Sequence, residues 1–104
     1  MPDQEYEGWK NYETWCVALW INNDQGTQET VLDMARACKG NKGIVASVNQ
    51  SHYDLSHQLK DWIEEQNPLA DSASMFSDLL NAALSEVDWY ELAESFLQDI
   101  KEEE

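Results

Sequence analysis

The stretch EVDWYELAESFLQDI at residues 86–100 carries the sharpest structural signal in this chain of 104 residues. Asp88 suits the N-cap of a helix, and Glu91 follows three residues later, as in a capping box. The apolar residues Val87 and Leu92 flank that start at the positions of a hydrophobic staple. The stretch therefore predicts a helix that begins after Asp88 and buries one face. That face consists of Trp89, Leu92, Ala93, Phe96 and Ile100.

Two helices are predicted in the N-terminal part of the chain. The first follows Asn11, a good N-cap, and ends in the polar run at residues 22–26. It is apolar nearly all round, which is typical of a central helix or of one that faces a partner. The second helix follows Thr27 as its cap and stops at Gly40, because glycine suits the left-handed position after a helix. One apolar face of the first helix would carry Tyr12, Trp15, Cys16 and Leu19.

Two more helices are predicted between these and residue 86. Ser51 and Asp54 resemble a capping box at the start of one of them, which ends before Pro68. Residues 44–48 are apolar and β-branched, and they fit either a helical turn or a short strand. The other helix is expected to start near residues 71–72. Its apolar stripe would consist of Met75, Phe76, Leu79, Leu80, Ala83 and Leu84.

These segments predict an all-α bundle of about five helices, a single domain over residues 1–104 with flexible ends at 1–10 and 101–104. The length fits one domain, because a second core would be too small to be stable. Leu, Ile, Val and Phe make up only about a fifth of the chain, which is close to the composition of disordered proteins. However, five Trp and four Tyr residues add much burial capacity, at roughly 150–250 Å² each. We therefore expect a folded chain.

The chain is strongly acidic, with 21 Asp and Glu residues against 6 Lys and Arg residues and a net charge of −15. This charge argues against direct binding to nucleic acid and to anionic membranes, because both ligands attract basic residues. The N-terminal residues lack the features of a secretory signal. The longest apolar run, residues 17–21, falls far short of the roughly 20 residues of a membrane span. We therefore expect a cytoplasmic protein that does not bind membranes.

Most of the negative charge lies in residues 61–104, which contain 13 acids and a single base, Lys101. On the predicted helices many of these acids fall opposite the buried stripes. Two interpretations are about equally favoured: a solvated face that aids solubility, or a surface that docks on a basic groove of a partner protein. The candidate partner-binding residues are Asp71, Asp78, Glu86, Asp88, Glu91, Glu94, Asp99 and Glu102.

The sequence offers little support for metal binding or catalysis. Cys16 and Cys38 form no C-x-x-C pair, and His52 and His57 would diverge by about 140° on a helix. There is no G-x-S-x-G motif and no phosphate-binding loop. A nucleophile pair of Cys38 with either histidine is a weaker alternative than a cysteine in the core. We predict no metal site, no cofactor and no enzyme activity.

The five tryptophans divide into two groups. Trp15, Trp62 and Trp89 fall on apolar stripes and are predicted to lie in the core. Trp9 precedes the first helix, and Trp20 lies on the side of that helix away from Trp15. Exposed Trp side chains are enriched in binding hot spots. Trp9 and Trp20 are therefore candidate aromatic contacts, to another protein or in a homodimer, although burial in the core is the more common fate.

Two blocks of the sequence resemble a family of small proteins without assigned function, encoded by phages, plasmids and other mobile elements. Residues 11–26, NYETWCVALWINNDQG, carry its pattern Asn-x-Glu-Thr-Trp, then Leu-Trp, then Asn-Asp-x-Gly. Residues 68–89 resemble it less specifically, and residues 39–50 match no family pattern. The blocks cover about half of the chain, and Cys16 is not part of the pattern. The resemblance implies a mobile-element protein acting in the cytoplasm of a bacterial host, often against host defences.

Charge and resemblance together suggest an inhibitor of a host DNA-targeting defence system, either an anti-CRISPR or an antirestriction protein. It would present its carboxylates as a DNA mimic to a host protein with a basic nucleic-acid-binding surface. The alternative is a small adaptor or self-associating module that uses exposed aromatic side chains, with the acidity serving solubility.

Overall fold

The structure, a computed structural model, describes residues 6–41 and 48–103 and contains five α-helices. It confirms the predicted all-α fold, and the described residues add only an isolated bridge between Tyr6 and Trp9. The helices are α1 (Tyr12–Asn23), α2 (Gln25–Asn41), α3 (Val48–Glu65), α4 (Met75–Ser85) and α5 (Trp89–Glu103).

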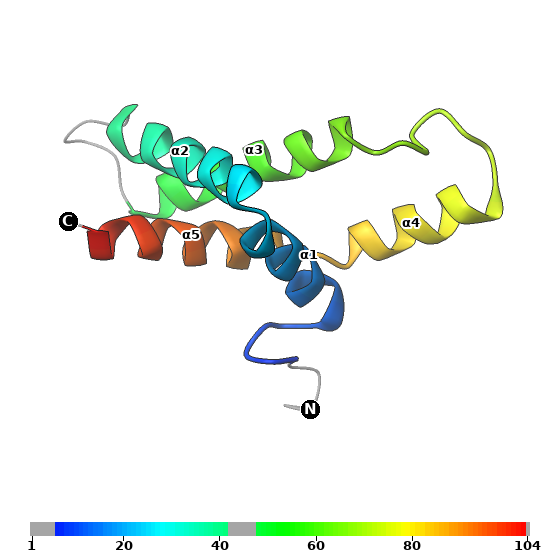
Figure 1. Cartoon of the computed structure of the whole chain (residues 1–104), viewed down its shortest axis with the longest axis horizontal. Helices are drawn as coiled ribbons and strands as arrows, with labels where there is room; N and C mark the ends of the chain where they lie inside the picture. Colours follow the sequence, from blue (N-terminus) through cyan, green and yellow to red (C-terminus); the bar gives the residue numbers. More distant parts are fainter. Residues whose placement is uncertain (1–5, 42–47, 104) are drawn as a thin grey trace.

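The core lies where α1, α2 and α3 pack on α5 (Figure 1). The predicted stripe of α5 is confirmed, because Leu92, Ala93, Phe96 and Ile100 are buried, while Trp89 is half-buried against them. From the other helices, α2 and α3 contribute most of the remaining apolar side chains, which pack from two directions on α5. These side chains are Val31, Ala35, Cys38, Leu55 and Leu59.

Both helix caps that the sequence indicates most clearly are confirmed. Asn11 caps α1, since its Oδ1 accepts the Thr14 N–H at 2.9 Å, and Asp88 caps α5 by accepting the Glu91 N–H at 3.0 Å. The other hydrogen bond of the predicted capping box, from the Asp88 N–H to the Glu91 side chain, is wrong. The Asp88 N–H donates to Thr14 Oγ1 at 2.9 Å, rather than to Glu91. Val87 and Leu92, the predicted staple, are both buried.

The buried face of α1 differs from the apolar face expected from its sequence. Thr14, Ala18 and Ile21 are buried, so a threonine occupies the interior next to two apolar side chains. The Thr14 hydroxyl fits there because it donates to Asn11 Oδ1 at 2.6 Å and accepts from Asp88. The residues of the expected face are half-buried or exposed: Tyr12, Trp15, Cys16 and Leu19.

The predicted limits of α2 were wrong at both ends. The helix begins at Gln25, because the Asp24 carbonyl already accepts the Gln28 N–H at 2.8 Å. Thr27 therefore lies in the first turn, where its hydroxyl donates to the Asp24 carboxylate. Gly40 does not stop the helix, which continues to Asn41.

The capping box predicted for α3 was also wrong. The helix begins at Val48, so Ser51 and Asp54 lie inside it, and Ser51 is buried. Residues 44–47 of the apolar segment lie outside the described residues. The predicted end before Pro68 is confirmed, since α3 ends at Glu65.

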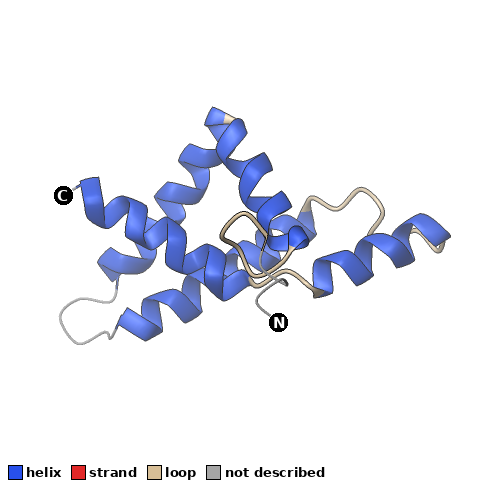
Figure 2. Ribbon diagram, turned by 90° about the horizontal axis from the view of Figure 1, so that it is seen from below, coloured by secondary structure: helices blue, strands red, loops and turns tan. Residues whose placement is uncertain are grey.

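The fourth helix starts later than predicted and extends away from the others. Ser74 and Ser77 form a capping box, each N–H donating to the other hydroxyl at 3.1 Å, so α4 begins at Met75 rather than near residues 71–72. The helix projects along the longest axis of the molecule, end to end with α5 (Figures 1 and 2). The radius of gyration of 14.6 Å accordingly exceeds the roughly 13 Å of a compact chain of this length.

Replacing Thr14 with valine tests the buried hydroxyl group. The Thr14→Val variant keeps the shape of the side chain but leaves the Asp88 N–H without its acceptor. Unfolding in urea should show a loss of about 1–3 kcal/mol, because an unpaired buried polar group is costly. The matched control is Thr30→Val on the exposed face of α2, where the loss should stay within about 0.5 kcal/mol. Equal losses in the two variants would contradict the assignment.

Candidate functional site

A tight turn at the N-terminus holds the chain beside α5. Tyr6 and Trp9 exchange two backbone hydrogen bonds of 2.6 and 2.8 Å, and the residues between them, Glu7 and Gly8, have φ angles of 51° and 90°. The Trp9 side chain packs partly buried against the core. Tyr6 contacts the ring of Trp15 at a centroid distance of 4.9 Å. Residues 6–9, part of the end expected to be flexible, are thus attached to the bundle on both sides.

Two of the candidate carboxylates hold this N-terminal segment in place. Glu91 Oε1 accepts the backbone N–H of Lys10 at 3.0 Å, and the Lys10 Nζ lies 4.0 Å from Asp88 Oδ2. Both acids are half-buried. Asp88 also caps α5. These two residues therefore have structural roles, whatever else they bind.

Three further candidate acids, which precede or follow Asp88 in the sequence, are exposed. Glu94 is exposed and lines a groove of about 440 Å³ together with Trp9 and Glu91. Glu86, the C-cap of α4, is exposed, and its backbone carbonyl accepts from Asn11 Nδ2 at 2.7 Å. Asp99 is exposed on α5. The side chain of Glu102 lies outside the described residues.

The other two candidate acids lie beyond the junction of α4 and α5. Asp78 is exposed in the first turn of α4, and Asp71 is exposed in the turn that precedes this helix. The two helices follow one another along about 40 Å, at 1.5 Å per residue. The structure therefore brings Glu91 and Glu94 together at one groove. Asp78, Glu86 and Asp99 lie at other positions along the axis of the two helices.

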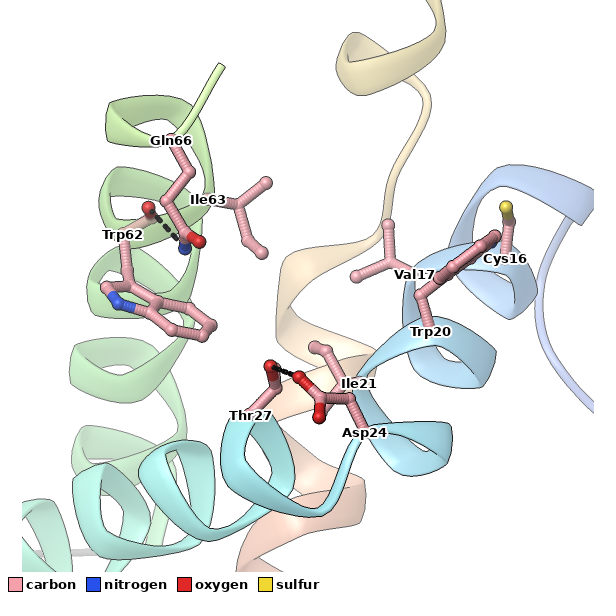
Figure 3. A pocket seen from close by; sticks show the side chains of 9 residues that line it. All are labelled: Cys16, Val17, Trp20, Ile21, Asp24, Thr27, Trp62, Ile63 and Gln66. Atoms are coloured by element: carbon pink, nitrogen blue, oxygen red, sulfur yellow. Dashed lines mark hydrogen bonds between the residues drawn. The ribbon is translucent and has the colours of Figure 1, made fainter. Parts of the chain in front are cut away.

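An apolar pocket of about 480 Å³ lies between α1, the start of α2 and the end of α3 (Figure 3). Trp20 lines it from α1 and remains 72% exposed, whereas the other candidate aromatic, Trp9, is half-buried. Trp62 and Ile63 line the opposite side from α3. The sequence predicts that Trp62 lies on an apolar stripe in the core, but nothing in it indicates that α1 leaves this side chain partly uncovered.

The residues considered for metal binding or nucleophilic catalysis are distributed over α1, α2 and α3. Cys16 is half-buried in α1, while Cys38 is buried in α2. His52 Nδ1 lies 3.2 Å from the Tyr90 hydroxyl, and His57 packs against the ring of Tyr53. Among the described side chains, no group of three or more His, Cys, Asp and Glu residues could hold a metal ion. None of the described helices combines the length and apolar character that crossing a bilayer requires.

The two kinds of carboxylate on α5 should differ in their effect on stability. Glu91→Ala removes the acceptor of the Lys10 N–H and an anion near the helix N-terminus, and should cost about 1 kcal/mol or more in urea unfolding. Glu94→Ala, one turn later and exposed, should change stability by no more than about 0.5 kcal/mol. If Glu94→Ala destabilises as much as Glu91→Ala, this division of roles is incorrect.

Comparison with known proteins gives the chain a family but no activity. Neither the curated proteins nor the solved structures contain a match to it. A family model matches residues 2–103, which is nearly the whole chain and includes every candidate residue above. Its description is a family of unknown function, so it assigns no role to any of these side chains. The chain therefore belongs to the family of unknown function DUF7249.

Proposed function

We propose that this protein inhibits a DNA-targeting defence enzyme by placing its acidic α4–α5 surface on that enzyme's basic nucleic-acid-binding groove. We define the acidic α4–α5 surface by the exposed carboxylates of Asp78, Glu86, Glu94 and Asp99, with Asp88 and Glu91 half-buried between them. The inhibitor would be an anti-CRISPR or antirestriction protein of a mobile element, acting in the bacterial cytoplasm. Its family block at residues 11–26 supports that context.

The observation that carries the proposal is the excess of negative charge, which Lys10 beside Asp88 offsets only in part. Residues 61–100 contain no Lys or Arg, so no basic side chain from these positions neutralises the surface. Like charges one turn apart on a helix cost a few tenths of a kcal/mol per pair. A surface that only served solubility would not need this imbalance, since mixed charges also keep a protein in solution. A field of one sign instead speeds association with a basic partner.

The spacing of the carboxylates is compatible with partial mimicry of one DNA strand. From Asp78 to Asp99, the six carboxylates of the acidic α4–α5 surface occur about once per 6 Å, at 1.5 Å per residue. One strand of a DNA duplex carries one phosphate per about 3.4 Å. The protein can therefore match about every second phosphate, and its binding should depend on salt less steeply than that of DNA itself.

Charge reversal at Glu86 and Glu94, whose side chains are exposed, tests the proposal. Glu86→Lys combined with Glu94→Lys should weaken inhibition of DNA cleavage by about tenfold or more, because charges at an interface act strongly on association. The measurement is a cleavage assay with purified RNA-guided nucleases and restriction enzymes, repeated with competing duplex DNA. Glu29→Lys, an exposed position near the start of α2, is the control and should change inhibition by less than about twofold.

A pull-down from host lysate identifies the target. The expected capture is a nuclease or another DNA-binding complex that is released by DNA and by a few hundred millimolar salt. If duplex DNA does not compete, or if the double reversal binds as well as the natural protein, mimicry is excluded.

A second candidate function is binding of another protein through exposed aromatic side chains. The observation that favours it is Trp20, which is 72% exposed at the edge of the apolar pocket. An isolated exposed apolar side chain is ordinary, but an exposed tryptophan beside an uncovered apolar pocket is typical of an interface.

Trp20→Ala distinguishes this function from mimicry. Capture of a partner through the pocket should tolerate high salt and fall about tenfold or more in Trp20→Ala. Tyr53→Ala, which removes an aromatic side chain 56% exposed on α3, should leave capture unchanged. If capture falls with salt and not with Trp20→Ala, the partner does not use the pocket.

A further inference from the structure

The apolar face of α4 is exposed in its N-terminal half, whereas Leu80, Ala83 and Leu84 of the same stripe are half-buried. Met75, Phe76 and Leu79 are 65%, 65% and 62% exposed, although they share one side of a helix with a clear apolar stripe. The pairs of helices that pack closely are drawn from α1, α2, α3 and α5. Three large apolar side chains exposed together on one helix of a small protein mark an interaction site.

The same chain carries a second apolar surface that is open. The pocket between α1 and α3 has a volume of about 480 Å³, within the roughly 300–1,000 Å³ of typical ligand pockets. Trp20, Ile21 and Ile63 are among its lining residues, and its single acidic residue, Asp24, lies at the start of α2 (Figure 3). Its size and composition suit the apolar face of a helix, not a charged group.

The α4 helix of the same chain is held away from this pocket. Its C-terminal end is attached to α1, since Asn11 Nδ2 donates to the Glu86 carbonyl at 2.7 Å and the Asp88 N–H donates to Thr14. These bonds direct α4 along the axis of α5 and away from the bundle (Figure 1). Folding α4 back into the pocket would require the chain to turn at the junction that these two bonds hold. A second copy can occupy the pocket without that turn.

We propose that two copies of this chain form a symmetric dimer in which the apolar face of each α4 docks in the α1–α3 pocket of the other copy. Low charge on both surfaces is compatible with a second copy as the occupant, in a protein of net charge −15. Residues 72–85 contain a single charged side chain, Asp78, and residues 14–23, which include Trp20, contain none. Two acidic chains therefore meet little local repulsion where α4 would enter the pocket.

The area involved suits a weak dimer. The α4 side chains and Trp20 expose on the order of 500 Å² of apolar surface, given roughly 150–250 Å² for each aromatic residue. Counted on both copies of an isologous contact, this is about 1,000 Å², at the lower limit of specific interfaces. We therefore expect association in the micromolar range. This inference does not depend on the proposed inhibition of a defence enzyme, because Asp78 is the single residue of the acidic α4–α5 surface within α4, whereas Glu91, Glu94 and Asp99 lie on α5 outside the contact.

Cross-linking shows whether the α4 helix in the pocket belongs to a second copy or to the same chain. Cys16 lines the pocket, whereas Cys38 is buried, so a bismaleimide can join Cys16 to a cysteine placed on α4. The Leu79→Cys variant should give a covalent dimer in several-fold higher yield than Asn81→Cys, an exposed position on the polar side of α4. Adding Cys16→Ser to Leu79→Cys should abolish that product. A cross-link within one chain would show that the chain's own α4 closes on the pocket, and would overturn the proposal.

Sedimentation equilibrium measures the dimer itself. The natural chain should associate in the micromolar range, and Phe76→Gln should raise the dissociation constant about tenfold or more, whereas Asn81→Gln should not. Raising salt from about 50 to about 300 mM should strengthen the dimer, because screening reduces the repulsion between two acidic chains. A chain that remains monomeric at about 500 µM in both salt concentrations, with no preference for Leu79→Cys in cross-linking, would exclude the dimer.

Discussion

The buried side chain of Thr14 joins the start of α1 to the junction of α4 and α5, and the arrangement of the whole protein depends on this contact. Its hydroxyl donates to Asn11 and accepts from the N–H of Asp88, 74 residues further along the chain, so that one side chain connects the N-caps of two helices. Asn11 adds a bond to the Glu86 carbonyl. An unsatisfied polar group in the interior costs about 1–3 kcal/mol of stability. Removing one member of this network therefore destabilises the fold by leaving the hydrogen-bonding group of another member without its partner.

The network also connects two blocks that are distant in the sequence. Asn11 and Thr14 belong to the Asn-x-Glu-Thr-Trp block, and Glu86 and Asp88 belong to the stretch around the helix junction. A change in either block would leave a donor or an acceptor of the other block without its partner. The conformation at the junction in turn fixes the direction of α4, so a few hydrogen bonds determine which apolar surfaces remain open.

Sequence patterns predict the local features of this fold well, because those features depend on neighbouring residues. The caps Asn11 and Asp88 and the stripe of α5 follow from residue type and helical spacing. The patterns fail where burial or a hydrogen-bond partner depends on residues far away in the sequence. The stripe of α4 shows that the helix is amphipathic, but not that its apolar face is left uncovered. The candidate acids are found by the same spacing, yet the role of Glu91 as acceptor of the Lys10 N–H requires two segments 81 residues apart in sequence.

The two proposed surfaces would respond to salt in opposite ways. Attraction between the carboxylates around Glu94 and a basic groove of a partner would weaken as ions screen it. The contact of the α4 face around Phe76 with the pocket of a second copy would strengthen, because the same ions screen the repulsion between the two acidic chains. The two surfaces lie on successive helices whose junction is held by Asn11 and Thr14. A dimer formed through α4 would therefore leave α5 free to bind, and would present two acidic surfaces in a fixed geometry to one partner.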